Sequence, residues 1–166
     1  HLIKAGKVRY FALSNEWPWG LMEFIRLAKI KNLPLVCTLQ NSYSLINRIV
    51  ELGMTEIFFR EKLSFFSYSP LGFGHLSGKY LKDPRAAGRI NLFPGYAQRY
   101  NKSGVEKAIE KYDALAAKRN LSLTDLALSF VYSQWFVTST VIGATNIKQL
   151  KQNIAAYGLD IVDEEL

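Results

Sequence analysis

The chain has 166 residues, enough for one domain with a sizeable core, and its hydrophobic share of 49% is typical of an ordinary globular protein. Its formal net charge of +7 favours anionic ligands of any kind, from nucleic acid to a phosphorylated cofactor. No apolar run approaches the ~18 residues of a membrane span, no signal peptide is visible, and a lone Cys37 suits a reducing compartment, so we expect a cytoplasmic protein without a membrane segment.

Four short runs of apolar and β-favouring residues predict strands that are buried on both faces. In chain order these runs are residues 8–13, 35–39, 63–68 and 137–142. Cys37 lies within the second run and is expected to be a buried structural thiol. Each run is followed by residues with helical periodicity. Repeated strand–helix units predict an α/β fold with a parallel sheet, either an open doubly wound sheet or part of a (β/α) barrel.

The helices are marked by their first residues and by the spacing of their apolar side chains. Pro18 opens a helix after the first strand, and residues 47–60 form an amphipathic stretch after the second. A long connection and two helices follow the third strand. The second of these helices is opened by Ser122, with Asp125 at capping-box distance. The helix after the fourth strand places four apolar residues on one face, namely Ile147, Leu150, Ile154 and Tyr157.

Polar residues and glycines gather where each predicted strand ends. They are Ser14 and Asn15, Gln40 and Asn41, residues 69–74, and residues 143–146. Because parallel strands end at the same edge of a sheet, these groups predict a binding edge. Amides, hydroxyls, an aromatic ring, a glycine loop followed by basic residues and a helix N-terminus suit a phosphorylated, flat-ringed ligand such as a nicotinamide dinucleotide.

The glycine loop fits neither common phosphate-binding fingerprint. Residues 72–79 read G-x-G-x-x-x-G-K, which misses the dinucleotide pattern G-x-G-x-x-G by one position. A P-loop would need Gly at position 73 and Ser or Thr at position 80, where the chain has Phe73 and Tyr80. The pattern by itself leaves a phosphate loop and an ordinary turn equally open.

Four stretches, in order, resemble the fifth to eighth strands of the aldo-keto reductase family with their exits: GKVRYFALSN, LVCTLQNSYSL, FFSYSPLGFGHLSGKY and VIGATNIKQLKQNI. The S-P-L-x-x-G-x-x-x-G-K-Y form is most similar to the branch containing potassium-channel β-subunits and their bacterial relatives. The resemblance implies that residues 1–166 form a single partial domain, the C-terminal half of a (β/α)8 TIM barrel. It also implies an NADP-dependent oxidoreductase that reduces aldehydes or ketones to alcohols.

The resemblance further implies which residues hold NADPH. The nicotinamide carboxamide would be held by Ser14, Asn15 and Gln40, and its ring would stack on Tyr68. The loop over the pyrophosphate would comprise Ser69, Pro70, Leu71, Gly72 and Gly74. The cofactor phosphates, including the 2′-phosphate of NADP, would meet Lys79 and Arg89. The adenosine end would be surrounded by Gly143, Thr145, Gln149 and Asn153.

Structural explanations for several of these residues remain open. Ser14 and Asn15 could form a cap for the helix that Pro18 opens. Tyr68 could be a core residue, and Lys79 and Arg89 could be solvated loop charges. Two further side chains invite a chemical role that the resemblance does not support. We interpret Tyr43 as a structural tyrosine and His75 as a surface or lid side chain.

The resemblance places the catalytic Asp, Tyr, Lys and His of the family on the first half of the barrel, which this chain does not match. We therefore assign no catalytic residue and no metal ligand, and expect residues 1–166 alone to be a truncated form without turnover of a carbonyl substrate. Open edges of a half barrel predict self-association. The alternative function is a non-catalytic, nucleotide-binding regulatory module. Nucleic acid is not an expected partner, because the aromatic residues fall mostly within core runs.

Overall fold

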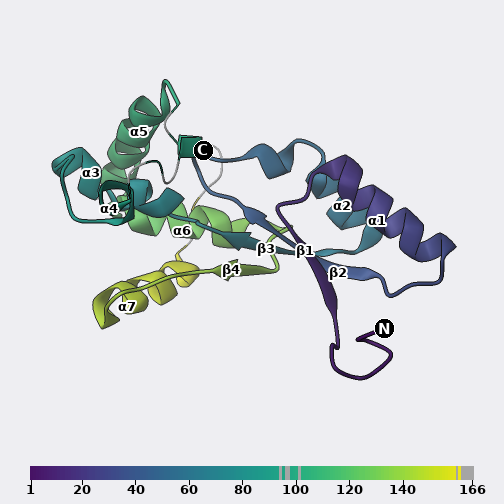
Figure 1. Cartoon of the computed structure of the whole chain (residues 1–166). Helices are drawn as coiled ribbons and strands as arrows, with labels where there is room; N and C mark the ends of the chain where they lie inside the picture. Colours follow the sequence, from purple (N-terminus) through teal and green to yellow (C-terminus); the bar gives the residue numbers. More distant parts are fainter. Residues whose placement is uncertain (94, 96–97, 101, 160, 162–166) are drawn as a thin grey trace.

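The computed structural model describes residues 1–93, 95, 98–100, 102–159 and 161 (Figure 1). Its four strands, β1 (Phe11–Ser14), β2 (Val36–Ser42), β3 (Ser64–Tyr68) and β4 (Ser139–Val141), form one parallel sheet in the order β1-β2-β3-β4. A doubly wound sheet reverses its strand order at a switch point, whereas here each strand pairs with the next. The α/β fold is confirmed, and its strand order is that of part of a (β/α)8 barrel.

Helices follow each of the four strands (Figure 1). They are α1 (Pro18–Ile30), α2 (Met54–Glu61), α3 (Lys79–Lys82), α4 (Arg89–Leu92), α5 (Val105–Lys118), α6 (Leu123–Ser133) and α7 (Ile147–Ala155). The described residues also form four short 3-10 turns, namely η1 (Ile49–Glu51), η2 (Gly72–Ser77), η3 (Gln98–Tyr100) and, after α7, η4 (Ala156–Gly158). The amphipathic stretch expected over residues 47–60 is divided into η1 and α2, because Gly53 takes a positive φ of 103° between them.

The core is built around aromatic side chains between the sheet and the helices. Phe65 of β3 stacks on Phe58 of α2 with ring centroids 5.0 Å apart, and Tyr43 stacks on Phe130 of α6 at 5.7 Å. Tyr43 is fully buried, and its hydroxyl donates a 2.5 Å hydrogen bond to Glu51 Oε1. Tyr43 is therefore a structural tyrosine, as the sequence indicates.

The two outer strands differ from the expectation of strands buried on both faces. Phe11 in β1 and Val141 in β4 are 38% and 46% exposed, and the predicted apolar face of α7 lies open as well. Cys37 is exposed rather than buried, and its thiol donates to the main-chain oxygen of Phe11 at 3.1 Å. Each outer strand pairs on one side only in the described structure. A continuous apolar strand implies a covering layer on both faces, and the described residues do not supply that layer at β1 and β4.

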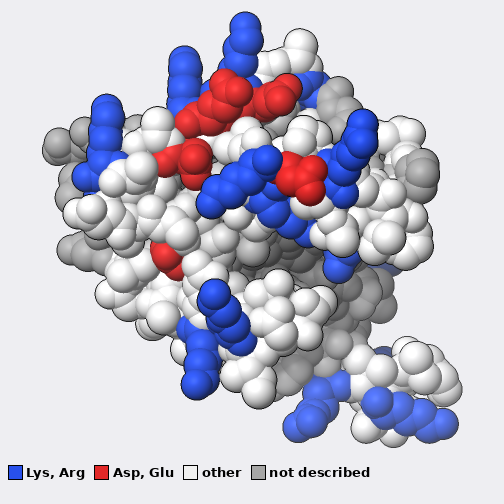
Figure 2. Space-filling model, turned by 90° about the vertical axis from the view of Figure 1, so that its left-hand side faces the viewer, with Lys and Arg blue, Asp and Glu red and all other residues white. Residues whose placement is uncertain are grey.

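On the face in Figure 2, acidic side chains lie among the lysines and arginines of the upper half, so the positive excess does not form a continuous patch there. Within the ranges that the structure describes, no helix combines the length and apolar character needed to cross a bilayer.

Candidate cofactor site at the carboxyl edge of the sheet

Residues from three neighbouring strands meet where β1, β2 and β3 end. Ser14 Oγ donates to the main-chain oxygen of Gln40 at 3.1 Å, and Asn15 Nδ2 donates to Ser14 Oγ at 3.1 Å. The hydroxyl of Tyr68 donates to Asn15 Oδ1 at 2.6 Å across 53 residues of sequence. These contacts bring together the four residues that the sequence assigns to the nicotinamide end.

The structure decides between two explanations for Ser14 and Asn15. The N-cap of α1 is Trp17, and no side chain caps that helix. Asn15 instead takes a positive φ of 57°, a conformation that asparagine tolerates well, and its main-chain N–H donates to Gln40 at 3.0 Å. The two side chains therefore belong to the strand edge and not to a helix cap.

Amide groups with unused hydrogen-bonding capacity lie beside this cluster. Asn41 Nδ2 donates to the main-chain oxygen of Glu16 at 2.9 Å, whereas its Oδ1 is buried without a partner in the described residues. The side-chain amide of Gln40 likewise makes no hydrogen bond within the ranges described. Because a buried polar atom without a partner is costly, Asn41 Oδ1 can accept from a polar ligand at low desolvation cost, and the half-buried amide of Gln40 has its hydrogen-bonding atoms available.

Arg99 joins the cluster from η3, and the sequence did not single it out as a site residue. Its Nη1 donates to Ser42 Oγ at 2.7 Å and to the Tyr68 hydroxyl at 3.2 Å. Ser42 is buried at the end of β2 and also accepts from Asn47 Nδ2 at 2.7 Å. The only sequence signal for Arg99 is its place in the basic stretch after the glycine loop.

The loop after β3 is a chain of tight turns. Ser69 and Gly74 have positive φ values of 55° and 100°, and the N–H groups of Gly74 and Leu76 donate to the main-chain oxygen of Leu71. Pro70, within the loop, is buried.

Gly72 has a packing role that the sequence did not anticipate. A Cβ added there would lie 2.7 Å from Ile46 Cδ1. The absence of a side chain at Gly72 therefore leaves room for the side chain of Ile46. A role of Gly72 toward a pyrophosphate stays a prediction.

Lys79 begins α3 and Arg89 begins α4, and specific contacts hold both side chains. Lys79 Nζ donates to the main-chain oxygen of Ala87 at 3.1 Å and lies 4.8 Å from the centroid of the Tyr80 ring. The guanidinium of Arg89 lies 5.6 Å from the centroid of the Phe73 ring. Both cations are thus held by cation–π contacts, Lys79 to Tyr80 and Arg89 to Phe73, and their contact with cofactor phosphates stays a prediction.

The exit of β4 is organised by side-chain amides at the start of α7. Gln149 Oε1 accepts from Thr145 N at 2.8 Å and from Thr145 Oγ1 at 3.0 Å, and Asn153 Nδ2 donates to the main-chain oxygen of Gly143 at 3.1 Å. Asn146 caps α7 through Gln149 N at 2.9 Å. Among the described residues these side chains contact one another and the main chain near them, and none of them contacts Tyr68 or Lys79, so their assignment to the adenosine end stays a prediction.

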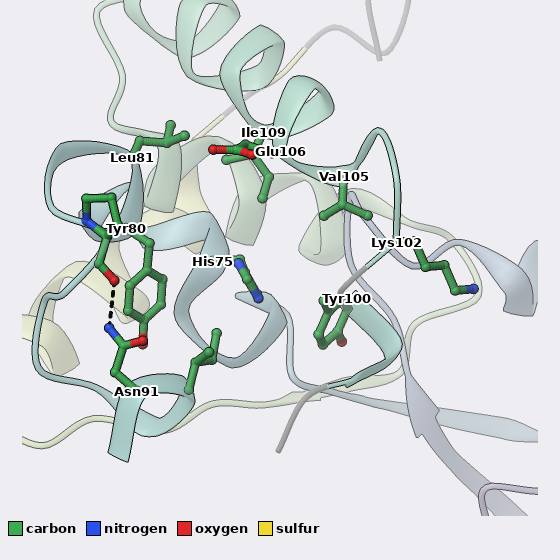
Figure 3. Close-up of a pocket in the computed structure, with 11 residues that line it drawn as sticks. His75, Tyr80, Leu81, Asn91, Tyr100, Lys102, Val105, Glu106 and Ile109 are labelled. Atoms are coloured by element: carbon green, nitrogen blue, oxygen red, sulfur yellow. Dashed lines mark hydrogen bonds between the residues drawn. The ribbon is translucent and has the colours of Figure 1, made fainter. Parts of the chain in front are cut away.

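A cavity of about 310 Å³ lies behind the loop, between η2, the α3–α4 connection and α5 (Figure 3). His75 and Tyr80 line it, and both His75 Nε2 and the Tyr80 hydroxyl are buried without a hydrogen-bond partner among the described residues. Burial lowers the pKa of His75 below its ordinary value, so the imidazole is neutral at pH 7. His75 therefore lies half-buried under the loop and not on an open surface.

The Aldo/keto reductase family model matches residues 1–166. The chain belongs to this family. The expected family is thereby confirmed, while the finer resemblance to the channel β-subunit branch stays a prediction. Aldo-keto reductases generally use a nicotinamide dinucleotide, NADH or NADPH.

Three proteins with different names are similar to this chain in sequence. Protein tas of Escherichia coli (strain K12) is 40% identical over 163 residues, covering 98% of this chain and 47% of that protein. An aldo-keto reductase of Babesia bovis is 38% identical over 159 residues, covering 92% and 56%. The L-glyceraldehyde 3-phosphate reductase of E. coli (strain K12) is 28% identical over 161 residues, covering 94% and 46%. The chain thus spans about half the length of the relatives it matches.

The described residues fit a nicotinamide dinucleotide in this family. Gln40 and Asn41 at the end of β2 have amide atoms without a hydrogen-bond partner among the described residues, and the Tyr68 hydroxyl of the neighbouring β3 donates to Asn15 Oδ1. Two cations, Lys79 and Arg89, are held at the loop. Amide groups and an aromatic ring suit the nicotinamide of such a cofactor, and the two cations suit its phosphates.

Proposed function

We propose that this chain is the cofactor-binding half of an NADPH-dependent aldo-keto reductase that reduces aldehydes or ketones to alcohols. The observation that carries the proposal is the convergence of Ser14, Asn15, Gln40 and Tyr68 at one sheet edge. Membership of the family supports an oxidoreductase, and the preference for NADPH rests on the cations of the loop.

In this proposal the residues of the edge bind and orient. The free amide of Gln40, with Ser14 and Asn15, would hold a carboxamide and so fix the rotation of the ring that carries it. Tyr68 would cover one face of that ring by stacking, which leaves the other face to a substrate and keeps water from one side. When bound, the nicotinamide supplies the hydride for carbonyl reduction.

Proton transfer to the developing alkoxide needs an acid, and none of the residues assigned here supplies it. We therefore propose that residues 1–166 alone bind cofactor without sustaining turnover. The relatives include a protein named L-glyceraldehyde 3-phosphate reductase, which supports an aldehyde as the class of substrate.

The proposal is tested by titrating the chain with NADPH and with NADH and following nucleotide fluorescence. Substituting Arg89→Ala is expected to weaken NADPH binding about 10-fold, because one charge-assisted hydrogen bond to the 2′-phosphate is lost. NADH lacks that phosphate, so its affinity is expected to change less than about twofold.

The matched control is Arg85→Ala, which removes the same charge from the same connection. Arg85 is exposed and has no side-chain role in the cluster or the loop. Equal losses for NADPH in both variants would mean that the effect is general electrostatics. An unmodified chain that binds neither nucleotide would contradict the proposed function itself.

A further inference from the structure

Arg99 is held in a fixed place at the ends of β2 and β3. Its Nη1 donates to Ser42 Oγ at 2.7 Å and to the Tyr68 hydroxyl at 3.2 Å. Ser42 is 6% exposed and is itself anchored by Asn47 at 2.7 Å. One nitrogen of the guanidinium is therefore tied to the sheet, which lowers the entropy cost of using the others.

The rest of the guanidinium is unused in the structure as described. Neither Nε nor Nη2 of Arg99 donates a hydrogen bond, and no described carboxylate forms an ion pair with it. An arginine fork presents two parallel N–H donors, a geometry that matches a carboxylate or a phosphate. Arg99 is thus a prepositioned cation without a carboxylate partner among the described residues.

The position of Arg99 separates it from the cations assigned to the cofactor phosphates. Lys79 and Arg89 contact rings of the loop, whereas Arg99 contacts Tyr68, the ring assigned to the nicotinamide. The oxidised nicotinamide is positively charged, and like charges placed together are unfavourable. A negative group bound beside Arg99 would relieve that repulsion.

We infer that Arg99 selects carbonyl substrates that carry a carboxylate or phosphate group, which it binds through its free Nε and Nη2. The inference rests on the proposed function and deepens it by naming the class of substrate. Arg99 would determine specificity and would not take part in the transfer of hydride or proton.

The test measures binding in the natural full-length protein saturated with NADP⁺, so that no turnover occurs. The probes are 4-oxobutanoate, an aldehyde with a carboxylate, and its uncharged methyl ester, each titrated by calorimetry. The unmodified protein is expected to bind the anion at least about 10-fold more tightly than the ester. Arg99→Met is expected to reduce this preference to within about twofold, and Arg99→Lys to retain part of it.

Arg85→Met is the matched control, because it removes an exposed arginine from the same connection without touching the cluster. It is expected to keep the anion preference. The preference for 4-oxobutanoate over its ester should also appear as a ratio of kcat/KM values with NADPH. In Arg99→Met, kcat/KM should fall for the anionic aldehyde and not for the ester.

Three results would overturn the inference: an Arg99→Met protein that keeps the preference, an equal loss for anion and ester, or a selective loss of NADPH over NADH affinity. The first result would show that Arg99 does not select the anionic substrate. The second would give Arg99 a structural role, and the third would assign it to a cofactor phosphate. A protein that binds NADPH but shows no anion preference refutes this inference alone. A protein that binds no NADPH refutes the proposed function as well.

Discussion

Gly72 combines a backbone requirement with a packing requirement. Its φ of 53° lies in the left-handed region, and an added Cβ would meet Ile46 Cδ1 at 2.7 Å and Cγ1 at 3.3 Å. Phe73 shows that the loop accepts a side chain at a similar φ of 57°. The close approach of Ile46 is therefore the stronger reason for glycine at position 72.

We expect Gly72→Ala to lower the free energy of unfolding by about 1–3 kcal/mol, because alanine is strained at positive φ and the half-buried Ile46 side chain must shift. Urea denaturation followed by circular dichroism measures the change. Gly143→Ala is the control, since no atom lies within 4 Å of its added Cβ and its φ lies outside the left-handed region. Equal stability of the two variants would show that Ile46 yields without cost.

At the scale of elements, α6 anchors both the core and α7. Its residues from Leu123 to Val131 are buried apart from Asp125, and Ser122 forms a reciprocal capping box with Asp125 at 3.2 Å. Gln152 of α7 donates to Ser122 Oγ and to Asp125 Oδ1, both at 3.0 Å. The cap of one helix is therefore also the attachment of the next.

Ser122→Ala is expected to cost about 1–2 kcal/mol of stability, because it removes the cap and one bond to Gln152. Thermal or urea unfolding gives the value. Hydrogen exchange should also quicken at the first turn of α6, where Asp125 N loses its acceptor. Ser103→Ala serves as control, since no side-chain hydrogen bond of Ser103 occurs in the described structure, and a similar loss there would argue against the capping explanation.

At the scale of the whole molecule, the described sheet ends in two unpaired edges with apolar side chains beside them. Ile147 and Ile154 on α7 are 73% and 61% exposed, although their spacing is that of a buried face. Phe11 and Phe24 form a second exposed apolar group beside β1, with ring centroids 6.3 Å apart. Exposed apolar surface next to open strand edges favours association.

We therefore expect the isolated 166-residue chain to associate with further copies of itself through these edges. Analytical ultracentrifugation across a range of concentrations should give masses that rise above the 18.9 kDa of one chain. Replacing Ile147 and Ile154 together by lysine should shift the distribution toward the monomer, since both charges would have to be buried at the contact.

The control for this experiment is Lys151→Gln, a change on an exposed polar position of the same helix. It should leave the mass distribution unaltered. A chain that sediments as a monomer at every concentration would contradict the expectation, and so would an association that the double lysine variant leaves intact.

The sequence by itself determined the local elements and their order. Apolar runs of strand length marked all four strands within a few residues, and the Ser122 capping box and the polar strand exits followed from residue types at short spacing. Parallel strands necessarily end at one edge, so the meeting of Ser14, Gln40 and Tyr68 could be anticipated. Short-range patterns suffice here because each reflects contacts along a few residues of chain.

Only the tertiary structure decided which surfaces are covered and which distant residues meet. The exposure of Cys37 and of the apolar face of α7 could not be deduced, because apolar periodicity presumes a covering layer without specifying which residues supply it. The contact of Arg99 with Tyr68 spans 31 residues and depends on the path of the connection after β3. Such contacts arise from how the chain folds back in space, for which residue spacing carries no signal.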